Sequence, residues 1–130
     1  MSNTQFCDKW TPYALGLLRI ITGFLFLQHG SSKLLGMPHN TMFDGLQLMS
    51  LIGAAGVLEL VGGTLILIGL FTRPVAFILS GQMAVAYFMA HAPGGILPIN
   101  NHGELAVLFS FVFLYFSVAG AGKLSVDSAR

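Results

Sequence analysis

The chain has 130 residues, of which 55% are apolar and only 8% are charged, and its formal net charge is +1. A soluble domain carries about 25% charged residues, so the composition excludes a water-soluble globular domain and indicates a largely lipid-facing surface. The small net charge and the lack of a basic run exclude a nucleic-acid partner, and a single cysteine, Cys7, excludes an intrachain disulfide.

Four apolar segments qualify as membrane-crossing helices, each of which needs about 20 residues. Pro12 is placed in the first turn of the first segment, Pro74 opens the third, and "AGAGK" after the fourth is a helix-stop signal. A link as short as "TR" makes the second and third segments an antiparallel hairpin. The sequence predicts an all-α, integral membrane four-helix bundle, one domain over residues 1–130 with spans at about 12–35, 51–71, 74–92 and 103–118.

Two longer connectors join these spans. Residues 36–50 have apolar side chains at 43, 46 and 49/50, so part of this connector is expected to form a short interfacial helix. Residues 92–102 contain two prolines, two glycines and two asparagines, which predict irregular backbone at the interface or buried in protein. Both termini are predicted to be cytoplasmic, because basic residues favour that side and four of them fall there: Lys9, Arg73, Lys123 and Arg130.

One charged residue, Glu59, lies near the centre of the second span. A charge at a helix centre costs about 2.5–3.5 kcal/mol on insertion, and such residues usually face the bundle interior and a partner. Glu59 shares a helix face with Gly56, Gly62 and Gly63, where small residues let a neighbouring helix approach closely. The predicted partner is Arg19 of the first span, because the helical rise places the two residues at depths that differ by about 7 Å.

Polar side chains of the other spans gather toward the outer half of the membrane. In the first span they follow one stripe, at spacings of three and four residues, from Arg19 through His29 to Lys33. Asn100 or Asn101 is expected to cap the fourth helix, with Glu104 at the positive end of its dipole. Together these groups predict a polar pocket open to the outer face, with the candidate ligand-binding residues Arg19, His29, Lys33, Glu59, His91, Asn101 and Glu104.

The segments "LRIITGFLFLQHGSSKLLG" (18–36), "VLELVGGTLILIGLFTRP" (57–74) and "NHGELAVLF" (101–109) resemble the DoxX family of small bacterial four-helix membrane proteins. The resemblance extends over nearly the whole chain. The positions that carry it are Arg19, Gly23, His29, Gly30, Lys33, Glu59, Gly62, Gly63, Arg73, Asn101 and Glu104.

This resemblance implies a multi-pass protein of the bacterial inner (plasma) membrane. The family is named for relatives of the membrane subunits of a thiosulfate:quinone oxidoreductase, and other members have been linked to oxidative-stress complexes and to detoxification of quinone or catechol compounds. We therefore expect a membrane subunit associated with oxidoreduction, which binds a quinone-like or small apolar ligand. An oxidoreductase partner subunit and a homo-oligomer are the expected assemblies.

The sequence leaves several alternatives open. The acidic and basic residues of the spans can form a purely structural ion pair instead of a ligand site. Four histidines suggest a metal or haem, but the chain has no HxxxH, HExxH or Cys–His cluster, so no metal site is predicted and haem is disfavoured. A small proton-coupled carrier or exporter, in which Glu59 titrates, and a membrane anchor or scaffold without its own ligand are the competing functions.

Overall fold

Helices form all the regular structure in the described part of the chain, which in this computed structural model comprises residues 2–40, 45, 47 and 49–130. Four long helices dominate. They are α1 (Asn3–Leu35), α2 (Leu51–Ile68), α3 (Thr72–Ala86) and α5 (Glu104–Ala119). The shorter elements are a π-helical turn (Tyr87–His91) and a 3₁₀ turn (Ala92–Gly94) that prolong α3, followed by α4 (Pro98–Asn101) and α6 (Val126–Ala129).

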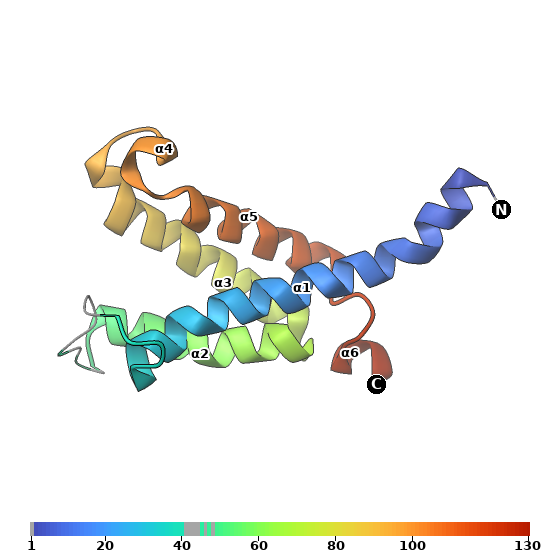
Figure 1. Cartoon of the computed structure of the whole chain (residues 1–130), viewed down its shortest axis with the longest axis horizontal. Coiled ribbons are helices and arrows are strands. Elements are labelled where there is room, and N and C mark those ends of the chain that lie inside the picture. The colour runs from blue at the N-terminus through green and yellow to red at the C-terminus, as the bar shows by residue number, and fades with distance from the viewer. Residues whose placement is uncertain (1, 41–44, 46, 48) are drawn as a thin grey trace.

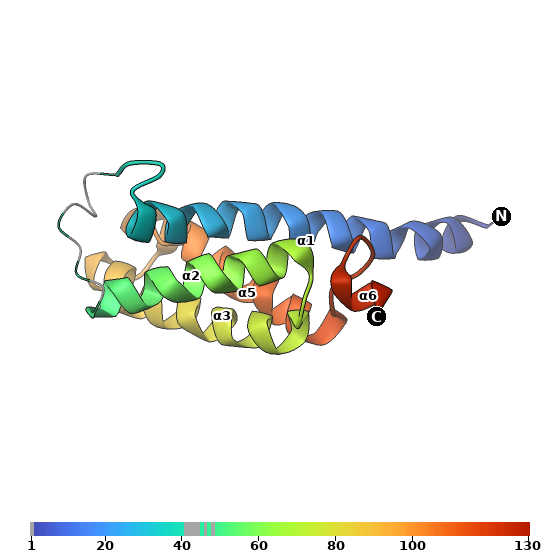
Figure 2. The ribbon, with the colours of Figure 1, turned by 90° about the horizontal axis from the view of Figure 1, so that it is seen from below.

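The long helices pack as two hairpins, α1 with α2 and α3 with α5 (Figures 1 and 2). We call the end that holds the α2–α3 turn and residues 119–130 the closed end; both termini lie on this side of the molecule (Figure 1). The opposite end, with residues 29–35 of α1, the start of α2 and residues 82–104, is the open end, because the two hairpins separate there (Figure 1).

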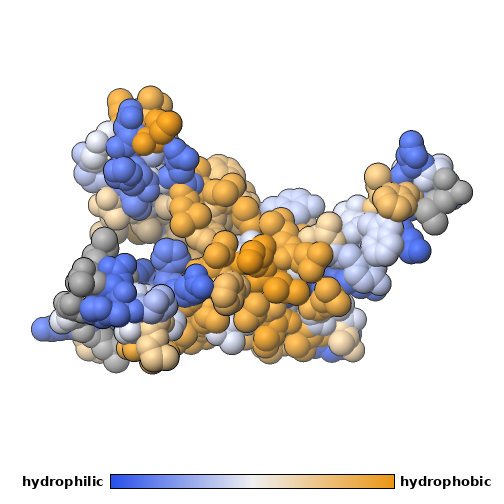
Figure 3. Space-filling model, in the orientation of Figure 1, coloured by the Kyte–Doolittle hydropathy of each residue, from blue (hydrophilic) through white to orange (hydrophobic). Residues whose placement is uncertain are grey.

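The surface of the bundle is largely apolar, whereas two of the described buried residues are charged. Phe77, Phe111 and Val118 are 67%, 66% and 75% exposed, whereas Arg19 and Glu59 are 0% and 3% exposed. Hydrophobic surface covers the middle of the bundle, and hydrophilic residues gather at the ends of the hairpins (Figure 3). Three helical segments are long and apolar enough to cross a membrane, and α5 is a shorter apolar helix. The predicted all-α membrane bundle is therefore confirmed.

The first helix begins nine residues before the predicted start at Pro12. Ser2 caps it: the Ser2 hydroxyl accepts from the N–H of Gln5, and the Gln5 side chain accepts from the N–H of Ser2. This reciprocal capping box is a strong start signal, and the helix continues through Pro12. The N-terminal turns of α1 project beyond the bundle (Figure 1).

Two further predictions about element ends need correction. The α2–α3 link is not "TR" but residues 69–71, because Gly69 (φ 72°) ends α2 in the left-handed region that glycine readily adopts. Gly103, not Asn100 or Asn101, is the N-cap of α5. Of the interfacial helix predicted within 36–50, positions 43 and 46 lie outside the described residues, and Met49 and Ser50 are not helical.

Glycines bring the backbones of α1 and α2 into direct contact. A Cβ added at Gly30 would lie 2.3 Å from the backbone nitrogen of Leu60, and one at Gly63 would lie 2.9 Å from that of Leu27. Any side chain at these positions would push the helices apart, as in other close-packed membrane helix pairs. These contacts fix the register in which Gly30 lies opposite Leu60.

Aromatic side chains join the two hairpins. The Phe26 ring of α1 packs edge-on against Phe109 and Phe113 of α5, with centroid separations of 5.4 and 4.9 Å. Within the second hairpin, Ser80 and Ser110 each donate a hydroxyl hydrogen bond to the other's carbonyl oxygen, at 2.7 and 3.0 Å. Phenylalanine rings therefore form a layer in the core between the hairpins. The hydroxyl groups of Ser80 and Ser110 beside it are hydrogen-bonded to each other's backbone carbonyls.

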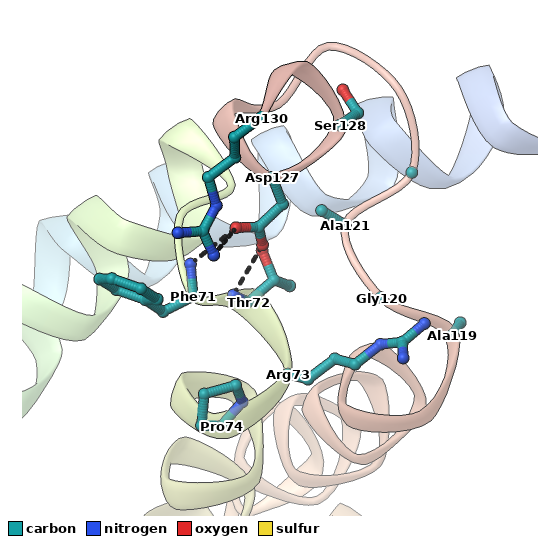
Figure 4. A pocket seen from close by; sticks show the side chains of 11 residues that line it. Phe71, Thr72, Arg73, Pro74, Ala119, Gly120, Ala121, Asp127, Ser128 and Arg130 are labelled. Carbon is teal, nitrogen blue, oxygen red and sulfur yellow. Dashed lines mark hydrogen bonds and ion pairs between the residues drawn. The ribbon is translucent and has the colours of Figure 1, made fainter.

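The C-terminal segment closes the bundle at the start of α3. Phe71 at the N-cap has φ 53° and gives no side-chain cap, so the first N–H groups of α3 lack a local acceptor. Asp127 supplies it: its carboxylate accepts from the N–H groups of Phe71 and Thr72, at 3.0 and 2.9 Å (Figure 4). The N–H of Asp127 also donates to the carbonyl of Gly69, at 2.9 Å. A residue more than fifty positions away thus caps this helix.

The Gly30→Ala substitution should destabilise the bundle, because the new methyl group meets the α2 backbone rather than a movable side chain. We expect the free energy of unfolding to fall by about 1–3 kcal/mol, measured by denaturant titration of the detergent-solubilised protein. Gly81→Ala is the matched control, since nothing lies within 4 Å of the added Cβ. Equal destabilisation by the two substitutions would contradict the proposed contact.

The Asp127 cap predicts a pH-dependent stability. Burial raises the pKa of Asp127, but hydrogen bonds from Thr72 and Phe71 and the nearby charge of Arg130 outweigh it and hold the pKa below its usual range. The stabilisation is therefore complete above the unfolded pKa of about 3.9 and is lost as the pH falls through the lower folded value. We expect the melting-temperature difference between wild type and Asp127→Asn to be constant near neutral pH and to shrink below about pH 4. A constant difference down to the acid limit would count against this cap.

Candidate functional site

A buried ion pair joins α1 to α2 at the open end. The Lys33 ammonium nitrogen lies 2.7 Å from both carboxylate oxygens of Glu59, and the side chains are only 13% and 3% exposed. Gly56, one turn before Glu59, makes room for this contact, because a Cβ there would lie 3.1 Å from the Cβ of Lys33. The glycine face of α2 therefore places a carboxylate directly beside the lysine of α1.

Gln82 of α3 completes this cluster from the second hairpin. Its amide nitrogen lies 3.3 Å from Oε1 of Glu59 and 3.5 Å from the carbonyl oxygen of Ala55. Its amide oxygen is buried and has no hydrogen-bond partner among the described residues. Rotating the amide would bring that oxygen against the carboxylate, so Glu59 fixes the orientation. The cluster of Lys33, Glu59 and Gln82, which we call the carboxylate cluster, thus leaves one acceptor open.

His29 lies one helical turn before Lys33, as the stripe predicts. Its side chain is exposed, and its ring meets the edge of Phe109 with a centroid separation of 6.3 Å. No hydrogen bond joins His29 to another residue in the described part of the chain. Its ring nitrogens are therefore accessible beside the carboxylate cluster.

A second polar cluster lies at the open end of the other hairpin. Asn101 is 7% exposed, and its amide donates to the Tyr87 hydroxyl at 3.1 Å and to the Gly95 carbonyl at 2.9 Å. Its own backbone carbonyl accepts from Nδ1 of His91 at 3.1 Å. The structure therefore brings His91 and Asn101 together, as predicted for the outer pocket. Their hydrogen bonds, however, hold the irregular backbone between α3 and α5 in place.

Glu104, also predicted to line the pocket, lies apart from these contacts. Its side chain is exposed in the first turn of α5, and no hydrogen bond or ion pair links it to another described residue. Its carboxylate complements the positive end of the helix dipole. Of the predicted site residues, Glu59 and Lys33 are paired, His29 lies next to them, His91 and Asn101 form a separate group, and Glu104 is alone.

An apolar groove of about 250 Å³ lies between α2 and α3. Its α2 wall spans the level of Glu59 without including that residue, and its α3 wall ends at Leu79, three residues before Gln82. The groove is lined by Val57, Leu58, Val61, Gly62, Leu65, Val75, Ile78 and Leu79. Elsewhere, the hydrophilic open ends of the two hairpins are separated from each other (Figure 3).

Arg19 does not pair with Glu59, so this part of the sequence prediction is wrong. The guanidinium is fully buried at the closed end, where it donates five hydrogen bonds to backbone carbonyls. A guanidinium has five N–H groups, so none is left for a ligand. The acceptors are the carbonyl oxygens of Ile66, Leu67, Ala121, Lys123 and Leu124, at 2.7 to 3.2 Å.

The register of α1 on α2 explains this error. With Gly30 opposite Leu60, Glu59 lies beside the Lys33 end of α1, eleven residues or about 16 Å along the axis from the level of Arg19. At its own level Arg19 meets the carbonyls of Ile66 and Leu67 in the last turn of α2, where the negative end of the helix dipole lies. The arginine thus joins α1, α2 and the C-terminal segment.

Sequence reasoning missed Gln82 and Asp127. Gln82 is the one amide within the third apolar segment, so its isolation was a usable signal. Asp127 lies in a short polar tail with no pattern that points to the start of α3. Among the described residues, no three His, Cys, Asp or Glu side chains gather in a way that could hold a metal ion.

The fold and the buried charges define an integral membrane protein with a helical bundle. The sequence profile of the DoxX family matches residues 14–92, and the chain belongs to the DoxX family. It is 45% identical to an uncharacterized protein of Haemophilus influenzae, with 93% of each chain covered.

More distant relatives carry short descriptions. The chain is 30% identical to "Putative oxidoreductase CatD" of Bacillus subtilis, over 85% of this chain and 82% of that one. It is 28% identical to an uncharacterized membrane protein of Mycobacterium tuberculosis, with 89% and 80% of the two chains covered. No solved structure matches the chain.

Replacing the buried guanidinium should destabilise the protein strongly. Arg19→Met leaves several buried carbonyls without a donor, and we expect the free energy of unfolding to fall by at least about 3 kcal/mol. Arg19→Lys, which keeps three donors, should recover part of the loss. Thermal unfolding in detergent measures both, with Lys9→Met as the control at an exposed basic residue of the same helix. A melting temperature unchanged in Arg19→Met would contradict the assigned role.

Proposed function

We propose that this DoxX-family protein binds a quinone-like ring at the carboxylate cluster, as the membrane component of an oxidoreduction system. The observation that carries the proposal is the buried amide oxygen of Gln82, which has no hydrogen-bond partner in the described chain and lies beside a buried carboxylate. Buried polar atoms are nearly always paired, so an open acceptor at this position fits a ligand that donates a hydrogen bond.

The neighbouring surfaces suit the rest of such a ligand. A quinol or catechol has hydroxyl donors on an apolar ring, and ligand sites commonly combine apolar walls with a few oriented polar groups. The apolar groove between α2 and α3 ends one turn from Gln82 and is suited to an aliphatic tail. On this proposal His29 adds a polar contact from the exposed side, whereas Arg19 only holds the helices in place.

The two charges of the cluster give the site its chemistry. A hydroxyl that donates to Gln82 lies next to the carboxylate of Glu59, which is a suitable group to receive its proton. Lys33 contacts both oxygens of that carboxylate, each at 2.7 Å. We propose that the electrons pass to a partner oxidoreductase subunit that carries the redox cofactor. The printed name of the Bacillus subtilis relative is consistent with this assignment.

The distribution of basic residues supports a placement of the protein in the cell. Four basic residues lie in the first turns of α1, at the start of α3 or in the C-terminal segment, all of which belong to the closed end: Lys9, Arg73, Lys123 and Arg130. Because cytoplasmic ends carry an excess of basic residues, we propose that the closed end faces the cytoplasm of a bacterium and that the carboxylate cluster opens to the outer face of the inner membrane. A homo-oligomer, with the whole chain as one domain, is part of this proposal.

Ligand titration tests the function directly. We expect a short-tailed menaquinol or ubiquinol analogue to raise the melting temperature of the detergent-solubilised protein saturably. Gln82→Leu, which removes the open acceptor, should weaken the apparent affinity by about tenfold, and Glu59→Gln should weaken it as well. Thr64→Val, at an exposed threonine of α2 whose hydroxyl bonds only to Leu60, should leave it unchanged.

Other outcomes would point to the competing functions. A shift of equal size in wild type and Gln82→Leu would exclude binding at this cluster. Proton flux into liposomes that is lost in Glu59→Gln, without any quinol effect, would favour a carrier. No ligand effect combined with loss of partner-subunit assembly would favour an anchor.

A further inference from the structure

We propose that a cavity at the closed end binds the phosphate group of an anionic phospholipid through Arg73. This site is independent of the carboxylate cluster, which lies at the other end of the bundle. The cavity has a volume of about 590 Å³ and opens between the start of α3, the end of α5 and α6 (Figure 4). Its wall includes two arginines, Arg73 and Arg130, and one acidic residue, Asp127.

Arg73 packs against Gly120 and has no polar partner among the described residues. Its guanidinium lies against Gly120, where an added Cβ would be 3.0 Å from Nη2 and 3.1 Å from Nε. Figure 4 shows the side chain extending along the end of α5 toward Ala119 and Gly120. No hydrogen bond or ion pair joins it to another residue in the described part of the chain. An oriented guanidinium with free N–H donors is well suited to the oxygens of a phosphate.

The remaining charges of the wall favour an anion. Both carboxylate oxygens of Asp127 already accept hydrogen bonds from Phe71 and Thr72, and one of them also lies 3.3 Å from Arg130. Arg130 in turn lies over the Phe71 ring, 4.8 Å from its centroid. Counting side chains, the wall thus carries one positive charge in excess, and its one side-chain carboxylate is already engaged. A choline or ethanolamine cation would find no unengaged side-chain carboxylate among the described lining residues.

The position of the cavity favours a lipid over free phosphate. Arg73 lies at the start of the apolar part of α3, and Phe77 and Ile78, one turn later, are 67% and 55% exposed. Val118 at the end of α5 is 75% exposed. In a bilayer these side chains face acyl chains, so the cavity lies where the headgroup of the same lipid molecule would be. A free phosphate ion gains nothing from the adjoining apolar surface.

Lipid titration of the detergent-solubilised full chain tests this site. We expect phosphatidylglycerol to raise the melting temperature saturably, while phosphatidylcholine with the same acyl chains and inorganic phosphate have little effect. Arg73→Gln should weaken the apparent affinity for phosphatidylglycerol by about tenfold, the scale of one lost charge-assisted contact, and Arg73→Lys should recover part of it. Lys123→Gln is the matched control, since it removes a basic residue of the same end that does not line the cavity.

The other possible results would overturn the proposal. An equal response to phosphatidylcholine would show that the site does not select an anionic headgroup. A phosphatidylglycerol effect that survives in Arg73→Gln, or that is lost equally in Lys123→Gln, would show that Arg73 does not form the site. A response to inorganic phosphate that matches that of the lipid would assign the cavity to a soluble anion.

Discussion

The direct backbone contact between α1 and α2 is the constraint on which the other features depend. Glycines at positions 23, 30 and 63 leave no room for a side chain between the helices, so the helices pack in one register. That register sets which side chains of α1 meet which groups of α2. It brings Lys33 to Glu59 at one end and Arg19 to the last carbonyls of α2 at the other.

The two buried cations show two different ways to keep a charge within an apolar bundle. Arg19 spreads its charge over five carbonyl oxygens and pairs with none of the described acidic residues, which suits a purely structural role at a helix end. Lys33 meets a full negative charge, and the neighbouring glutamine leaves an acceptor unused. Only the cluster of Lys33, Glu59 and Gln82 has a buried acceptor without a partner among the described residues. This difference separates the candidate site from the structural contact at Arg19.

Much of this architecture can be predicted from the sequence, and its failures have definite causes. The apolar segments, the glycine face around Glu59 and the stripe that ends at Lys33 are local patterns, and the structure contains them all. The predicted partner of Arg19 is wrong because a depth estimated from the ends of each helix takes no account of the register between α1 and α2. Glycines on both helices together decide that register. The role of Asp127 depends on how the C-terminal segment folds back, and no local pattern encodes that contact.

The hydrogen bonds of Arg19 also bear on how the protein is made. The guanidinium belongs to α1, which is synthesised before the other described helices, but three of its five acceptors lie in residues 121–124. Until those residues have been made, water or the translocon has to solvate this cation. The final packing of α1 on α2 therefore becomes possible only when residues 121–124 reach the closed end, which orders the steps by which the bundle assembles.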